Sequence, residues 1–196
     1  MIVKDGDEAV LRDLMEQKRI TKYRLSKSSG LPYTTVNDIC EGRTQIEKCS
    51  AETIYKLAKA LDVSMEALIE PYVNRPSFEL FKSNVCHKLK ELGDIGFIAD
   101  VLTSSSIRNY YELRWFTESL YLLAMVDYIS RVNDVPICNE YDDLRHCALA
   151  DTVYPASVLA AAAVSNNVQI KDQARKESIP EFIRFNIVES EVRDIV

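Results

Sequence analysis

The stretch from Thr21 to Arg43, TKYRLSKSSGLPYTTVNDICEGR, constrains the fold of this chain more than any other. It predicts a short helix, a tight turn at Gly30, and a second helix that begins at Pro32 and stops at Gly42. Thr21 suits the cap of the first helix, because its hydroxyl can accept from backbone N–H groups of the first turn. Gly30 stands where the chain must leave that helix in a left-handed conformation, which glycine adopts at little steric cost.

The second helix of this stretch has two different faces. Val36 and Ile39 are three residues apart and face inward, which leaves polar side chains on the outer face. Apolar stripes continue on both sides of the stretch, with a supporting helix at about residues 8–18 and two closing helices within residues 51–71. These segments predict a small domain of five helices over residues 8–71.

This arrangement resembles the helix-turn-helix of the Cro/C1-type (XRE-like) DNA-binding family, over about a third of the chain. The resemblance implies that the N-terminal end of the second helix enters the major groove of double-stranded DNA. In this family an arginine of the first helix often pairs with a glutamate late in the recognition helix. The matching positions here are Met15 and Cys40. We therefore expect apolar packing in place of the ion pair, an exchange that often costs little stability.

The resemblance also implies two sets of DNA contacts. The base-reading set lies on the outer face of the second helix: Tyr33, Thr34, Asn37 and Asp38. The set suited to phosphates lies in and around the motif: Lys22, Thr35 and Arg43. Thr34 can bond a base edge or pack its methyl group on a thymine, and Asp38 can accept from a cytosine amine. Because phosphates repel a carboxylate, a helix cap or a bond to Arg43 is an equally good interpretation of Asp38.

The net charge of −6 is unevenly distributed along the chain. Residues 1–70 carry a net charge of −1 and residues 71–196 a net charge of −5. Residues 12–27 hold six basic and two acidic side chains, a surplus where phosphate contacts are needed. A solvated helix face would explain such a cluster by itself, but the motif favours DNA. The acidic remainder should discourage indiscriminate binding, so we expect affinity to depend on dimerisation and on a correct site.

The stretch from Pro71 to Ser77 contains two prolines and lacks apolar periodicity, so residues 72–77 are interpreted as a linker. Residues 78–196 show helical apolar spacing almost throughout, which predicts an all-α fold with a helical bundle as the second domain. Its most apolar segment, Trp115–Pro136, is expected to be the central buried helix. Residues 78–92 and 94–102 should form two helices separated by Gly93. Residues 1–7 are polar, and we expect them to be loosely held.

The C-terminal part contains two further helical patterns. Pro155 opens a helix of small residues, against which a neighbouring helix could pack closely. The last segment starts at Pro180, and its apolar residues either close the bundle or form a face for a partner. Those residues are Phe182, Phe185, Ile187 and Val188.

Neither an active site nor a cofactor site is indicated by the sequence. Cys86-His87 and His146-Cys147 resemble halves of a zinc site, but adjacent ligands on a helix point in different directions. We therefore expect no metal, no catalytic residues and no cofactor. No apolar run is long enough to span a membrane, and the odd number of cysteines without CxxC spacing suits a cytoplasmic location.

Three hypotheses for the function follow. The first is a transcriptional regulator, a repressor that acts as a homodimer on an inverted repeat. The second is an antitoxin, whose residues 78–196 bind a toxin while the first domain autoregulates the operon. This alternative rests on a faint resemblance of the second domain to helical regions in such loci. The third is an enzyme or metal sensor in the second domain that switches the first.

Overall fold

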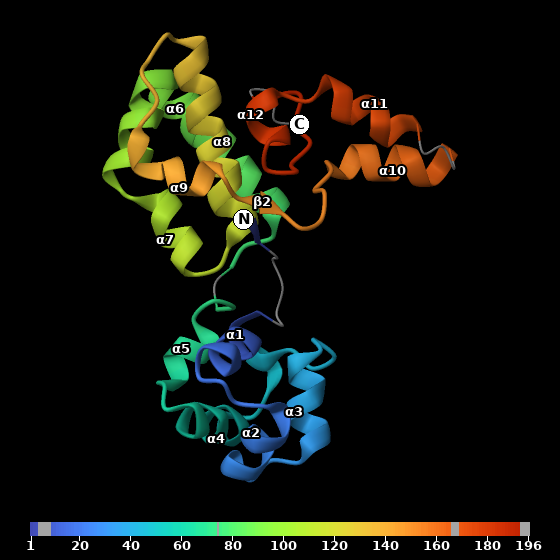
Figure 1. The fold of residues 1–196 in the computed structure, drawn as a ribbon. Helices are drawn as coiled ribbons and strands as arrows, with labels where there is room; N and C mark the ends of the chain where they lie inside the picture. The colour runs from blue at the N-terminus through green and yellow to red at the C-terminus, as the bar shows by residue number, and fades with distance from the viewer. Residues whose placement is uncertain (4–8, 74, 166–168, 193–196) are drawn as a thin grey trace. The chain divides into compact units, whose positions relative to one another are not determined.

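The computed structural model describes residues 1–3, 9–73, 75–165 and 169–192, which are mainly helical. The all-α fold class predicted from the sequence is confirmed. The chain divides into two compact units, drawn in Figure 1. The first unit spans Asp5–Arg75 and is called the head below. The second joins Met1–Lys4 to Pro76–Val196 and is called the helical unit.

The head is a small bundle of short helices with one 3-10 turn. Its elements are α1 (Ala9–Gln17), α2 (Lys22–Ser29), α3 (Tyr33–Cys40), η1 (Ile46–Lys48), α4 (Ala51–Leu61) and α5 (Met65–Ile69). α2 packs against α3 and α4, and α1 packs against α3. Apolar side chains from these helices form one core, which holds Leu11, Leu25, Val36, Ile39, Leu57 and Leu68. Burial of this apolar surface holds the short helices together, because helices of this length are marginal alone.

The helical unit contains the longer elements. They are α6 (Phe78–Thr103), α7 (Ser106–Glu112), α8 (Phe116–Val132), η2 (Asn139–Tyr141), α9 (Asp142–Arg145), α10 (Ala156–Ser165), α11 (Gln169–Glu177) and α12 (Pro180–Ile183). Gly93 has a φ of 67° inside α6, so the helix is kinked where the sequence predicts two separate helices. α9 and η2 were not predicted, because four- and three-residue elements are too short to show a periodicity.

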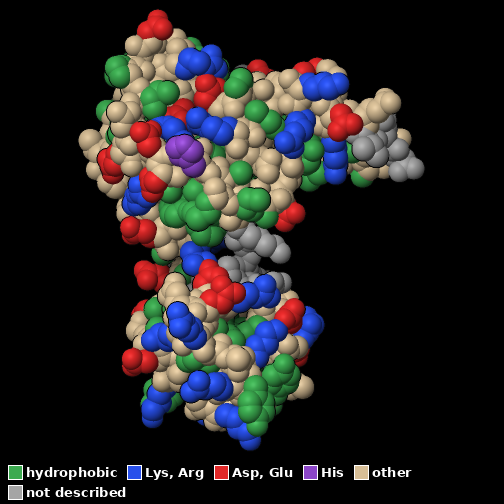
Figure 2. Space-filling view, in the orientation of Figure 1, with side chains coloured by type: hydrophobic (Ala, Val, Ile, Leu, Met, Phe, Trp, Pro, Cys, Tyr) green, Lys and Arg blue, Asp and Glu red, His purple; other side chains and the backbone are tan. Residues whose placement is uncertain are grey.

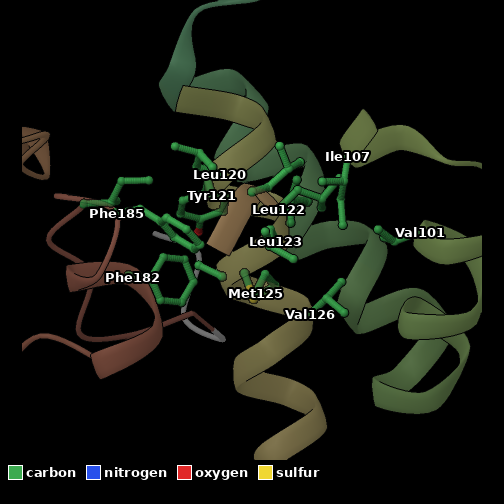
Figure 3. Packing of buried hydrophobic residues seen from close by; sticks show 14 of the residues in the cluster. Val101, Ile107, Leu120, Tyr121, Leu122, Leu123, Met125, Val126, Phe182 and Phe185 are labelled. Carbon is green, nitrogen blue, oxygen red and sulfur yellow. The ribbon is translucent and has the colours of Figure 1, made fainter. Parts of the chain in front are cut away.

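α8 is the buried centre of the helical unit, as the sequence predicts for this segment. α6, α7 and α12 all pack against it. Figure 3 shows Phe182 and Phe185 on one side of α8 and Val101 and Ile107 on the other. The rings of Phe182 and Tyr121 lie 5.0 Å apart between centroids. Of the two interpretations of the C-terminal segment, closure of the bundle is therefore the one that the structure supports.

The first residues of the chain belong to the helical unit. β1 (Ile2–Val3) pairs in parallel with β2 (Ala148–Leu149), and the Ala148 N–H donates to the Met1 carbonyl over 2.9 Å. Val3 is buried in the core of the unit. The prediction of a loosely held start is therefore wrong for residues 1–3. Strands of two residues show no alternating pattern, so this pairing could not be predicted from the sequence.

A buried carboxylate holds the C-terminal half of this unit together. Asp127 of α8 accepts from Arg145 Nε at 2.9 Å and from Arg145 Nη2 at 2.7 Å. It also accepts from Arg184 Nη2 at 2.6 Å. The Asp127 side chain is only 2 % exposed, so the two guanidinium groups must replace its hydration. The cluster fastens α9 and the end of α12 to α8.

Asp127→Ala should lower the free energy of unfolding of the helical unit by about 3–5 kcal/mol, because the largely buried Arg145 would lose its only buried charge partner among the described residues. Asp142→Ala is the control variant. It removes the second charge partner of Arg145, but the Asp142 side chain is 62 % exposed, so the loss should be less than about 1 kcal/mol. Trp115 is the single tryptophan and lies in this unit, so its fluorescence in urea follows this unit specifically. Equal losses in the two variants would contradict the role of Asp127.

Candidate nucleic-acid interface

α2 begins and ends as the sequence predicts. The Thr21 hydroxyl accepts from the Arg24 N–H at 3.3 Å, which confirms the cap. Gly30 ends the helix with φ 69° and ψ 15°, the left-handed conformation expected of it. α3 begins one residue later than predicted, because Pro32 has the extended ψ of 141° and forms the cap. Tyr33 is therefore the first helical residue of α3.

Hydrogen bonds from two serine side chains stabilise the turn between α2 and α3. Ser26 Oγ donates to the Leu31 carbonyl at 2.7 Å. The Leu31 N–H donates to Ser29 Oγ at 3.3 Å, and this hydroxyl donates in turn to the Leu25 carbonyl at 2.7 Å. These bonds fix the entry of α3 relative to α2, so the orientation of α3 is set before any ligand arrives.

The underside of α3 is buried in the core of the head. Val36, Ile39 and Cys40 are each at most 1 % exposed. Cys40 Sγ lies 3.6 Å from Met15 Sδ, which confirms the predicted apolar contact in place of an ion pair. Burial raises the pKa of the Cys40 thiol, so the group stays neutral and acts as a small apolar side chain. Arg12 Nη2 donates to the Cys40 carbonyl at 2.9 Å and closes the end of α3.

The outer face of α3 carries the predicted base-reading residues. Tyr33 is 50 % exposed, and Thr34 beside it is also exposed. Thr35, Asn37 and Asp38 are partly covered. The first turn of α3 is thus the part of the helix that is most open to a ligand.

Lys22 connects α2 to the middle of α3. Its Nζ donates to Asn37 Oδ1 at 3.0 Å and forms an ion pair with Glu41. The hydrogen bond from Lys22 and its charge hold the pKa of the Glu41 carboxyl below its usual value. Lys22, which was predicted to contact phosphates, is therefore hydrogen-bonded to Asn37, which was predicted to contact bases. Glu41 was missed from the sequence, although it stands four residues after Asn37 and so shares its helical face.

Arg43 and Asp38 form a second ion pair at the end of α3. Arg43 Nε donates to Asp38 Oδ1 at 2.9 Å, and Nη2 lies 2.7 Å from the same oxygen. Of the interpretations of Asp38, the bond to Arg43 is the one present in the structure. The two side chains are 56 % and 41 % exposed, and such a pair contributes less than about 1 kcal/mol. A phosphate could therefore displace Asp38 from Arg43 at little cost.

α2 adds basic and aromatic side chains to the surface of the head. Arg24 and Lys27 are exposed, and Lys27 Nζ lies 5.8 Å from the ring centroid of Tyr23. The Tyr23 side chain is 63 % exposed. Figure 2 shows Lys and Arg side chains spread over the visible face of the head. The charge surplus predicted from residues 12–27 thus reaches solvent on α2.

The helical unit carries the cysteines and histidines that resemble halves of a zinc site in the sequence. Cys86 and Cys147 are buried, whereas His87 and His146 are exposed. Within the described residues, no group of three or more His, Cys, Asp or Glu side chains is arranged to hold a metal ion. Among the same residues, no helix combines the length and the apolar character that crossing a bilayer requires.

Comparison with known proteins identifies the head. Residues 10–73 match the family described as the Cro/C1-type HTH DNA-binding domain. No curated protein and no solved structure matches the chain. The head is a Cro/C1-type helix-turn-helix DNA-binding domain, as the sequence predicts. This domain supports a role for the protein as a DNA-binding transcriptional regulator.

Glu41→Gln should tighten binding to cognate and unrelated duplexes alike, by about two- to fivefold. The variant removes a carboxylate at the end of α3, the predicted recognition helix, and would free the Lys22 ammonium for a phosphate. The slope of log K against log salt should become steeper by up to about 1. Fluorescence anisotropy at several salt concentrations measures both quantities.

Glu52→Gln is the matched control, because it removes the partner of a lysine on α4 instead. It should change the affinity little. Unchanged or weaker binding by Glu41→Gln would contradict the assignment of Lys22 to the DNA-facing surface.

Proposed function

We propose that the protein is a sequence-specific transcriptional repressor that acts as a homodimer on an inverted repeat in double-stranded DNA. One observation carries this proposal. α3 is fastened to the head by a buried underside, while Tyr33 and Thr34 stand exposed on its first turn. This is the arrangement in which a recognition helix offers its N-terminal residues to base edges in the major groove.

Base reading is assigned to the outer face of α3, which carries Tyr33, Thr34, Asn37 and Asp38. Phosphate binding is assigned to Lys22, Thr35 and Arg43. Two of these cations are paired inside the head, so binding exchanges a carboxylate partner for a phosphate at each. The exchange at Arg43 would also free Asp38 to accept from a cytosine amine. Because phosphates carry no sequence information, these two exchanges set the overall affinity for DNA, and the choice of a site rests on the base-reading face of α3.

Dimerisation follows from the small size of the reading surface. α3 has eight residues, so one head covers little more than a half-site. Helix-turn-helix proteins reach useful affinity by binding two half-sites about 34 Å apart through a two-fold axis. The net charge of −6 adds to this need, because the protein as a whole is repelled by DNA. A dimer bound over a promoter represses by excluding polymerase, and we place this activity in the cytoplasm.

Selection from a random duplex library with the full-length protein yields the operator for quantitative tests. Thr34→Ala should then reduce discrimination between the operator and single-base variants by about 1–3 kcal/mol, the value of one good base contact. Binding to unrelated DNA should stay the same, because Thr34 carries no charge. Anisotropy with operator variants measures the difference. Uniform weakening on every sequence would show that Thr34 does not read a base.

Lys22→Ala should weaken binding to all sequences alike and reduce the salt slope by about 1 per head, as expected for a lost phosphate contact. Lys90→Ala removes an equal charge from an exposed site on α6 and serves as the control. The control should leave both quantities unchanged. If Lys22→Ala also left them unchanged, the proposed placement of α2 and α3 on DNA would be wrong.

A further inference from the structure

α10 is an apolar helix that is covered on one side by α11 and is largely exposed elsewhere. None of its residues is buried, and its sequence ASVLAAAAVS contains no charged side chain. Leu159 is 44 % exposed and Val164 is 90 % exposed. In Figure 1, α10 and α11 lie side by side and extend away from α8. A helix that is apolar on every side is normally buried against a neighbour. The single chain provides α11 as a neighbour on one side of it.

The two sides of α10 differ in cover. Val158 and Ala162 are four residues apart and partly covered, as expected of the side that packs on α11. Leu159 and Ala163, also four apart, are exposed together with their neighbours at positions 156, 160 and 164. The open side of α10 is therefore a continuous apolar stripe, called the α10 stripe below.

α10 and α11 together are called the hairpin below. Polar contacts hold one end of this hairpin in place. Arg175 of α11 donates from Nη1 to Thr152 Oγ1 at 3.1 Å and from Nη2 to Asn186 Oδ1 at 3.3 Å. Lys171 Nζ lies 5.3 Å from the ring centroid of Tyr154. These contacts tie α11 to the segments before α10 and after α12. The α10 stripe is thus presented by an anchored hairpin, which reduces the ordering cost of any association.

We infer that the α10 stripe packs against the same stripe of a second copy, so that two α10–α11 hairpins form a four-helix bundle. The stripe has no charge, so pairing it with itself meets no repulsion and buries no ion. A two-fold interface requires such a self-complementary surface. The alanines allow two helices to approach at the short end of the usual 8–10 Å spacing. The choice of a second copy as the occupant rests on the dimeric function proposed above.

The size of the surface sets the strength of this dimer. α10 is about 15 Å long, from its ten residues and the helical rise. A two-helix face of that length buries on the order of 500 Å² per copy, near the lower limit of a specific interface. The free protein should therefore dimerise at about micromolar concentrations. On an inverted repeat, two bound heads raise the effective concentration of the hairpins and strengthen the pairing.

The test is sedimentation of the full-length protein without DNA, from about 1 to 200 µM, with three variants. Leu159→Glu and Ala163→Glu place a charge in the α10 stripe. Both sites are exposed and glutamate is a good helix former, so the chain should keep its fold and its helical circular dichroism. Ile95→Glu is the matched control, because Ile95 is a 59 % exposed apolar residue on α6 of the same unit.

The expected result is a dimer for the wild type and for Ile95→Glu, and a monomer for both α10 variants, with at least a tenfold rise in the dissociation constant. A folded Leu159→Glu or Ala163→Glu protein that dimerises like the wild type would overturn the inference. So would a wild type that stays monomeric, or one that gains mass only with a different protein. Operator binding by the same samples separates the two proposals: if it persists while the α10 stripe fails the test, only the dimer surface is wrong.

Discussion

The burial of one side of α3 determines which face of this helix is open to a ligand. Val36, Ile39 and Cys40 are held in the core of the head, so the helix cannot rotate or slide without losing that packing. The serines of the α2–α3 turn fix the same helix at its start. The outer face is therefore presented in one orientation. A rigid scaffold of this kind gives a recognition helix its precision, because no binding energy is spent on ordering it.

Charge sets the balance between selective and indiscriminate binding in this acidic chain. Two of the cations that we propose as phosphate contacts form ion pairs with carboxylates of the head, Lys22 with Glu41 and Arg43 with Asp38. Each pair lowers the positive field that unrelated DNA would meet. Each also holds its cation close to where a phosphate contact is proposed. The two ion pairs thus moderate the overall attraction to DNA and also hold both cations near the proposed phosphate contacts.

The sequence predicted the parts of the structure that depend on long apolar periodicities and on turn chemistry. The Thr21 cap, the Gly30 turn, the interruption of the helix at Gly93 and the buried α8 all belong to this class, although α6 is kinked at Gly93 where two separate helices were predicted. Contacts between segments that are distant along the chain could not be predicted, because no local sequence pattern encodes them. β1 pairs with β2 across 146 positions of the chain (Ile2 with Ala148), and Asp127 contacts two arginines from other parts of the chain. Glu41 was missed in the same way, since its partner Lys22 comes from another helix.

The central claim is that the outer face of α3 enters the major groove of operator DNA. Site-specific photo-crosslinking from a benzophenone amino acid at position 33 tests this claim most directly. Tyr33 is exposed on the first turn of α3, and its aromatic side chain is similar in shape to the part of the benzophenone side chain that would replace it. The experiment uses the full-length protein bound to its selected operator. The account predicts crosslinks to bases within both half-sites. A protein that remains bound to the operator but gives no crosslink from position 33 would contradict it.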